Sequence, residues 1–194
     1  MGLLHVLLQV GVVISMSGPM NPRQLAALQD ESNALWNAYG VKLVWFDHTD
    51  DCGSAEMVVT DAPIDVWLRV ETVEGTRPEP LLPSLGFVNF IGDVPGHTMY
   101  LRYGALSHLV SESRKTGWDF QRLPVPIRDQ LIGRALGRVV AHELGHVLLE
   151  SRSHDSGLMR ATLGAGDLLT PARDHLGLSR KAVTQLSKTL RSES

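Results

Sequence analysis

The sequence predicts an α+β fold in which a twisted mixed sheet of about four or five strands is backed by a helix. Three observations predict it: a strand–helix–strand pattern over residues 3–46, two short β-like runs in the middle of the chain, and one long amphipathic helix after them. The 194 residues are 43% hydrophobic and 20% charged, which is the composition of a globular protein with a sizeable core. We therefore expect residues 1–194 to form a single domain.

The chain begins with an apolar run over residues 3–14, whose second half, GVVIS, is β-branched. This composition favours a buried first strand. The alternative for residues 1–17 is a leader, although the run lacks the basic start of a signal peptide and is too short to span a membrane. The compartment, cytoplasmic or exported, therefore stays open, and no stable membrane insertion is expected.

A helix is predicted to start at Asn21, because asparagine is a good N-cap and Pro22 suits the first helical position. Apolar residues recur at helical spacing up to Gly40, which is expected to end the helix. The run VKLVWF, residues 41–46, follows as a strand. This strand–helix–strand opening favours a sheet backed by a helix.

Three further strands are predicted in the middle of the chain, over residues 64–70, 85–91 and 98–103. The stretch ETVEGTRPEPLLPS, residues 71–84, contains three prolines and a glycine, which indicates a surface loop. The last two strands are joined by GDVPG, and we expect them to form a hairpin-like pair.

The strongest helical pattern begins near Pro126 and continues to about Leu149. Its apolar residues recur at spacings of three and four and mark a broad surface for burial. About 24 residues give roughly 36 Å of helix, which is enough to cross the domain. A last helix is predicted from Ser179, its N-cap, to Leu190, with its Lys and Arg residues facing solvent.

The charge and the cysteine content exclude several classes of protein. The net charge is -3 and no run of Lys or Arg forms a patch, so nucleic acid is not expected as a partner. Cys52 is the single cysteine, which excludes an internal disulfide framework. It lies in the polar stretch DDCGS and is expected to be a loop residue. The sequence does not predict an oligomeric state.

The motif HELGH lies on the long helix. His142 and His146 are four residues apart, so they project from one helix face and both can reach one zinc ion at about 2.0–2.1 Å. Glu143 is rotated by about 100° from His142, which places it to reach a water on the metal rather than the metal itself. A carboxylate there can act as general base. Gly145 indicates a close approach of a neighbouring segment.

Catalytic zinc sites use a third protein ligand, which must come from outside HELGH. Arg152 is excluded, because a guanidinium stays protonated and offers no lone pair. His154 is the first candidate: if the helix ends near Leu149, residues 151–153 can form a turn that brings His154 back to the metal. Asp155 is the next candidate. Behind it stand three residues farther along the chain: Asp167, Asp174 and His175.

The stretch HELGHVLLESRSHDSGLM resembles the metzincin metallopeptidases, whose pattern is H-E-x-x-H-x-x-G-x-x-H followed by a methionine turn. Here Leu149 stands in place of the glycine and Arg152 in place of the third histidine. The spacing H-E-x-x-H-x7-H is similar to that of metzincin-type metallopeptidases of small bacterial proteins. The resemblance implies a zincin-like fold, and a role for Met159 as an apolar floor beneath the three imidazoles.

The same resemblance implies that one of the strands over residues 85–91 and 98–103 forms the upper rim of the cleft. An extended peptide could pair with that edge by adding a strand to the sheet.

These features predict a zinc-dependent metallopeptidase with one catalytic Zn²⁺. His142, His146 and His154 are expected to bind the ion, Glu143 to act as general base, and Met159 to support the site. The expected partner is a peptide or protein substrate, and its cleavage preference is not predicted.

Three other functions are weighed against this one. A zinc-stabilised binding domain without activity would keep the histidines but would not need Glu143. A metal-dependent endoribonuclease with H-x3-H-x5-H has no glutamate after its first histidine, and the negative net charge also disfavours RNA. A peptide deformylase would need a cysteine ligand in a glycine–cysteine–leucine context, whereas Cys52 lies in DDCGS.

Overall fold

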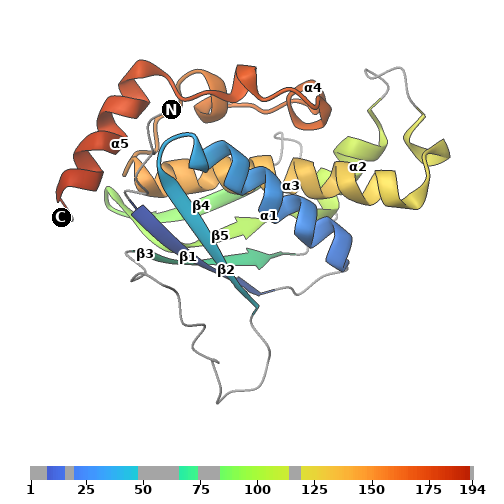
Figure 1. Cartoon of the computed structure of the whole chain (residues 1–194), viewed down its shortest axis with the longest axis horizontal. Helices are drawn as coiled ribbons and strands as arrows, with labels where there is room; N and C mark the ends of the chain where they lie inside the picture. The colour runs from blue at the N-terminus through green and yellow to red at the C-terminus, as the bar shows by residue number, and fades with distance from the viewer. Residues whose placement is uncertain (1–7, 16–19, 48–65, 74–83, 114–118, 193–194) are drawn as a thin grey trace, which may run out of the picture.

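The structure, a computed structural model, describes residues 8–15, 20–47, 66–73, 84–113 and 119–192. In these ranges five strands form one mixed sheet in the order β2-β1-β3-β5-β4 (Figure 1). Neighbouring strands are parallel except for β4, which is antiparallel to β5 at one edge. The strands are β1 (Leu8–Ser15), β2 (Val41–Asp47), β3 (Val66–Thr72), β4 (Gly86–Ile91) and β5 (Val94–Leu101). The predicted α+β fold is confirmed.

Helices α1 and α3 lie against each other on the sheet (Figure 1). The α-helices are α1 (Pro22–Asn37), α2 (Tyr103–Ser111), α3 (Val125–Leu148), α4 (Ala165–Leu169) and α5 (Arg180–Ser192). The described residues also include three short 3-10 helices: η1 (Phe120–Arg122), η2 (Gly157–Met159) and η3 (Asp174–Leu176). None of the described helices has both the length and the apolar character that crossing a bilayer requires.

The predicted starts of two helices are confirmed in atomic detail. The Asn21 side chain accepts hydrogen bonds from the backbone N–H groups of Arg23 and Gln24 at 3.1 and 3.0 Å. Ser179 Oγ accepts one from the N–H of Ala182 at 3.1 Å. These bonds satisfy N–H groups that have no partner inside the helix, which is why Asn and Ser stand at these positions.

The predicted first strand is also confirmed for its second half. β1 lies between β2 and β3, and all of its residues except Val13 and Ser15 are buried; Leu8, Val10, Val12 and Ile14 are at most 4% exposed. Residues 1–7 and Cys52 lie outside the described residues, as does most of the predicted loop over residues 71–84. The first two residues of that loop prediction were wrong, because Glu71 and Thr72 continue β3 and pair with β5.

The hairpin is tighter than predicted. β5 starts at Val94, not at residue 98, so the connection is a two-residue turn in which Gly92 has φ 61°. The prediction took Pro95 as a loop residue, but Pro95 pairs only with Phe90 of β4, and the pairing with β3 begins at Thr98. A proline is tolerated there because its missing N–H breaks no bond to a second neighbour. Tyr103 begins α2, a helix that was not predicted.

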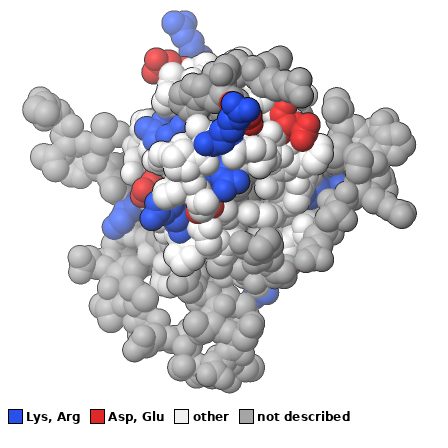
Figure 2. All heavy atoms as spheres, turned by 90° about the vertical axis from the view of Figure 1, so that its right-hand side faces the viewer, with Lys and Arg blue, Asp and Glu red and all other residues white. Residues whose placement is uncertain are grey.

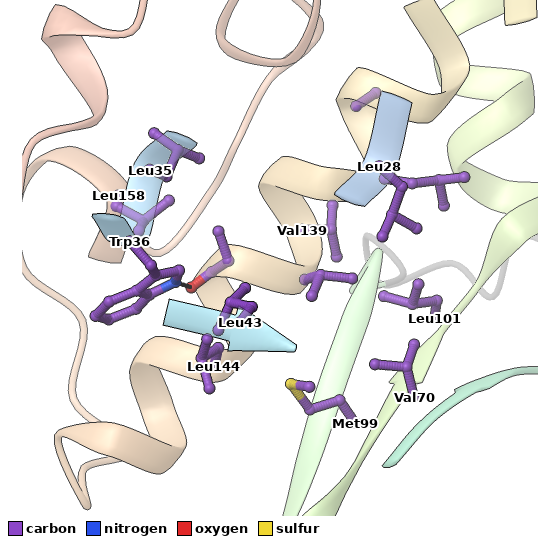
Figure 3. Close-up of a cluster of buried hydrophobic side chains, with 14 of the residues drawn as sticks. Leu28, Leu35, Trp36, Leu43, Val70, Met99, Leu101, Val139, Leu144 and Leu158 are labelled. Carbon is purple, nitrogen blue, oxygen red and sulfur yellow. Dashed lines mark hydrogen bonds between the residues drawn. The ribbon is translucent and has the colours of Figure 1, made fainter. Parts of the chain in front are cut away.

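Side chains from α1, α3 and the strands converge in one hydrophobic core (Figure 3). Trp36 is fully buried there, and its indole N–H donates to the backbone oxygen of Ala141 on α3 at 3.1 Å. The residues from Leu131 to Leu149 on and just after α3 are buried with the single exception of Arg134, which is half-buried. α3 is therefore a central helix enclosed on most of its surface.

Two glycines let α1 approach α3 closely. A Cβ atom on Gly133 would lie 2.3 Å from the backbone oxygen of Gln24, and one on Gly137 would lie 2.6 Å from that of Leu28. Ser32 adds a bond across the same contact, from its Oγ to the backbone oxygen of Gly137 at 3.1 Å. The axial position of α3 is therefore set by direct contact with the backbone of α1.

An ionic network centred on buried Glu31 and Arg138 joins the segment over residues 167–173 to α1 and α3. Arg138 is 0% exposed, and its Nε lies 2.8 Å from Glu31 Oε1 on α1. Arg173 binds the other oxygen of Glu31 at 2.7 Å, and Arg138 also donates to the backbone oxygen of Asp167. Burial alone would raise the pKa of Glu31, but the hydrogen bonds from Arg173 and Arg138 outweigh it and lower that pKa. The network ties α1, α3 and α4 together.

Gly137→Ala should lower the stability of the protein. The new methyl group meets backbone atoms of α1 that cannot rotate away, so the overpacking outweighs the gain of about 1 kcal/mol in helix propensity. We expect a net loss of about 1–2 kcal/mol in the free energy of unfolding, measured by urea denaturation.

Gly166→Ala is the matched control. A Cβ on Gly166, within α4, meets no atom within 4 Å, so this substitution should leave stability unchanged or raise it. If Gly137→Ala is as stable as Gly166→Ala, α1 does not press against α3 as described.

Candidate metal centre

The long helix brings the two histidines of HELGH together. His142 and His146 lie one turn apart on α3 and are 8% and 7% exposed. Their Nε2 atoms are 3.2 Å apart. Two nitrogens that bind one zinc ion tetrahedrally at about 2.0–2.1 Å would be roughly 3.3 Å apart. The spacing of this pair therefore fits a shared zinc ion.

His154 completes a cluster of three imidazoles. The ring centroids of the three histidines are 4.8 to 5.4 Å apart, and one potential ligand atom from each lies within 4.8 Å of the others. Within the described part of the chain, no other group of three or more His, Cys, Asp or Glu side chains is placed to hold a metal ion. The three residues predicted as metal ligands are thus brought to one point.

The turn after α3 carries His154 back to the helix. α3 ends at Leu148, and Glu150 then takes the left-handed conformation, with φ 47°. Helices often end with one such residue, usually glycine. The N–H of Ser151 donates to the backbone oxygen of His146 at 3.1 Å, and Ser153 N–H donates to Ser151 Oγ at 3.1 Å. These bonds form the turn over residues 151–153 that the sequence predicted.

Backbone carbonyls orient the two helical imidazoles. His142 Nδ1 lies 2.7 Å from the oxygen of Leu158, and His146 Nδ1 lies 2.6 Å from the oxygen of Ser151. A carbonyl oxygen can only accept, so each Nδ1 carries the proton and each Nε2 keeps its lone pair for a metal. Burial lowers the pKa of His142 to about 4 and also lowers the pKa of His146. Both rings are therefore neutral at physiological pH, as metal ligands must be.

Met159 packs directly against α3 at Gly145. It is 2% exposed, and a Cβ on Gly145 would lie 2.2 Å from its sulfur. Gly145 is therefore the close approach that the sequence indicated. Met159 belongs to η2, whose backbone also supplies the Leu158 oxygen to His142. The segment after the turn thus contacts α3 through the Met159 side chain and His142 through the Leu158 backbone oxygen.

Glu143 lies beside the histidines and close to the edge strand. It is 5% exposed, and a Cβ on Gly86 would lie 3.0 Å from its Oε1. Burial raises the pKa of Glu143 to about 8. A cation held by the neighbouring histidines would favour the charged carboxylate and lower this pKa. Position 86, at the start of β4, therefore needs glycine, because any Cβ atom there would displace the side chain of Glu143 or Val139.

A cavity of about 890 Å³ opens beside the cluster. His142, Glu143, His146 and His154 form part of its wall. The rest comes from residues 84–90 at and just before β4, from α2, from Val139 on α3, from Arg152 and from the segment that follows η2. Most of these residues are apolar: Leu85, Phe87, Val88, Phe90, Ala105, Leu109, Val139, Ala161 and Leu163. The three histidines therefore face a cavity that is large enough for peptide side chains.

The other ligand candidates are engaged elsewhere. Asp155 accepts a hydrogen bond from Ser179 Oγ, which lowers its pKa, and its carboxylate is exposed. Asp167 binds Arg160 at 2.7 Å, with His175 Nε2 3.8 Å away. Asp174 is exposed in η3 and is not in the histidine cluster.

Some parts of the site were not predicted. α2 contributes Ala105 and Leu109 to the cavity, but its sequence YGALSHLVS was not recognised as a helix. The glycine that opens GFVNFI marks the close approach of β4 to Glu143, and this signal could have been noticed. The carbonyl oxygens that orient the histidines have no signal in the sequence, because every residue carries one.

The fold and the three histidines define the class: a protein with a mixed five-stranded sheet and a long helix that carries two of three closely placed histidines. A solved structure shares this fold. It is archaemetzincin from Methanopyrus kandleri, with a TM-score of 0.51, 15% sequence identity and 97% of each chain covered. At this identity the likeness shows the fold alone. Neither a protein-family model nor a curated protein matches the chain.

Zinc stoichiometry tests which residue is the third ligand. The wild-type protein, stripped of metal and reloaded, should bind zinc, and Asp155→Ala should bind the same number of zinc ions per chain. His154→Ala should lose zinc on dialysis, because two imidazoles alone hold it weakly. Metal analysis after dialysis gives the stoichiometry. Zinc retained by His154→Ala and lost by Asp155→Ala would show that the aspartate is the ligand.

Proposed function

We propose that the protein is a zinc-dependent metallopeptidase. The observation that carries this proposal is that Glu143 lines the same cavity as three clustered imidazoles, two of whose ring nitrogens are 3.2 Å apart. This donor set is the one that catalytic zinc sites use, with a further position left for water. The shared fold with archaemetzincin and the cavity beside the cluster support it.

The residues divide the chemistry between them. His142, His146 and His154 would hold the ion, which when bound lowers the pKa of a water towards 7 and polarises the peptide carbonyl. Glu143 removes a proton from the attacking water as the water oxygen bonds to the carbonyl carbon. Glu143 then returns that proton to the amine nitrogen as the C–N bond breaks. The Glu143 carboxylate thus serves in both proton transfers, first as a base and then as an acid.

The edge strand offers a place for the substrate backbone. β4 has β5 on one side only, and residues 84–90 line the cavity. An extended peptide added along β4 would form main-chain hydrogen bonds there, and alternate side chains would enter the cavity. The apolar residues of that wall, Leu85, Leu109 and Leu163 among them, favour an apolar side chain next to the scissile bond.

The second candidate is a zinc-stabilised binding domain without activity. Such a domain needs the three histidines but gains nothing from a buried carboxylate beside them, since burial of Glu143 has a desolvation cost. We infer no nucleic-acid partner: the face shown in Figure 2 has basic and acidic side chains mixed among uncharged ones, and the net charge is -3.

Glu143→Gln should abolish turnover and leave zinc binding intact. The amide keeps the shape of the side chain but cannot take a proton, so we expect a loss of about 10²–10⁴-fold in kcat. Cleavage of a mixed peptide library by the zinc-loaded protein, followed by mass spectrometry, gives the measurement. Glu112→Gln, at an exposed residue directly after α2, is the matched control and should keep full activity.

The proposal is contradicted if the zinc-loaded wild type and Glu143→Gln give the same cleavage pattern and rate. Zinc binding without any cleavage that depends on Glu143 would favour the inactive binding domain.

A further inference from the structure

We propose that Arg152 is a positioning residue: it fastens the loop that carries His154 to the β4–β5 hairpin and thereby links the edge strand to the third metal ligand. This inference rests on the proposed zinc site. It concerns how that site is held together and how a peptide on β4 would influence it.

His154 differs from the other two histidines in how it is held. His142 and His146 are buried in α3, and each donates from Nδ1 to a backbone oxygen. His154 is exposed, and its ring makes no hydrogen bond to another described residue. Its position therefore depends on the loop over residues 151–155, and on whatever holds that loop.

Arg152 connects this loop to the hairpin by two contacts. Its Nη2 donates to the backbone oxygen of Gly92 in the β4–β5 turn. Its guanidinium carbon lies 4.8 Å from the centroid of the Phe90 ring on β4. Gly92 is 60 residues away in the sequence, so these contacts join separate parts of the fold. Arg152 stands only two residues before His154.

The other end of the loop is attached differently. The Asp155 N–H donates to the backbone oxygen of Met159 at 2.7 Å, and the Asp155 carboxylate accepts from Ser179. His154 thus lies between an attachment to η2 and α5 on one side and the Arg152 attachment on the other. On the Arg152 side, Ser151 is also bonded to His146, but Arg152 makes the contact that joins the loop to the β4–β5 hairpin.

An arginine is suited to this contact and a lysine is not. The planar guanidinium can stack on an aromatic face and donate sideways at the same time, whereas an ammonium group is compact and strongly hydrated. Phe90 and Arg152 both line the cavity beside the metal cluster. A peptide lying along β4 would contact this pair and press the loop into the position that His154 needs. We therefore expect Arg152 to influence zinc affinity and KM together.

Zinc affinity, measured by competition with a chelator, tests the assignment without relying on activity. Arg152→Ala should weaken zinc binding by about 10–100-fold, as the loss of a group that orients a ligand does. Arg152→Lys should not restore the affinity, and Phe90→Leu should weaken it in the same direction. Arg122→Ala is the control, because Arg122 pairs with Asp119 on the exposed surface of η1 and should change nothing.

A double-mutant cycle shows whether Arg152 acts through His154. In the His154→Ala background, Arg152→Ala should cause no further loss of zinc affinity. The visible spectrum of the cobalt-substituted Arg152→Ala protein should shift towards that of His154→Ala, because Arg152→Ala loosens the bond to the ligand that His154→Ala removes. Melting of the metal-free Arg152→Ala protein checks that the fold is kept.

The inference is overturned if Arg152→Ala binds zinc as tightly as the wild type, or if it causes an equal loss with and without His154. Failure of the proposed peptidase function has a separate signature, which is zinc binding without cleavage that depends on Glu143. In that case the zinc affinities would still decide the role of Arg152.

Discussion

The structure depends on the direct contact between the backbone of α1 and the small residues of α3. Gly133 and Gly137 leave no room for a Cβ between the two helices, and Trp36 continues the contact with a hydrogen bond to Ala141. These positions recur every four residues, so they form one face of α3. With that face pressed against α1, the rotation of α3 about its own axis is determined. His142 and His146 are consequently turned towards the cavity beside β4.

Residues beyond the end of α3 fix the orientation of the imidazole rings of His142 and His146. The turn after Leu148 places the Ser151 oxygen on the ring of His146, and the Leu158 oxygen lies on that of His142. Both imidazoles are thus held in the tautomer that leaves Nε2 free for a metal. Preorganisation of this kind lowers the cost of binding a metal, because little side-chain freedom remains to be lost. The third histidine has no such bond among the described residues, and the contacts of Arg152 take over part of that role.

Much of this arrangement could be predicted from the sequence, and the remainder has physical reasons. The length of α3, the helix starts at Asn21 and Ser179 and the meeting of the three histidines follow from local signals: periodicity, capping residues and spacing. The start of β5 could not be predicted, because Pro95 is tolerated only where one neighbouring strand is absent. The approach of Gly86 to Glu143 depends on long-range packing, which local patterns do not encode. The role of Met159 as a floor stays a prediction, supported by its contact with Gly145.

X-ray absorption at the zinc edge of the metal-loaded protein tests the central claim most directly. The account predicts three imidazole nitrogens at about 2.0–2.1 Å, one further oxygen donor, and no sulfur. A sulfur at about 2.3 Å would contradict it and indicate Cys52 as a ligand. A spectrum with only two imidazoles would contradict the assignment of His154.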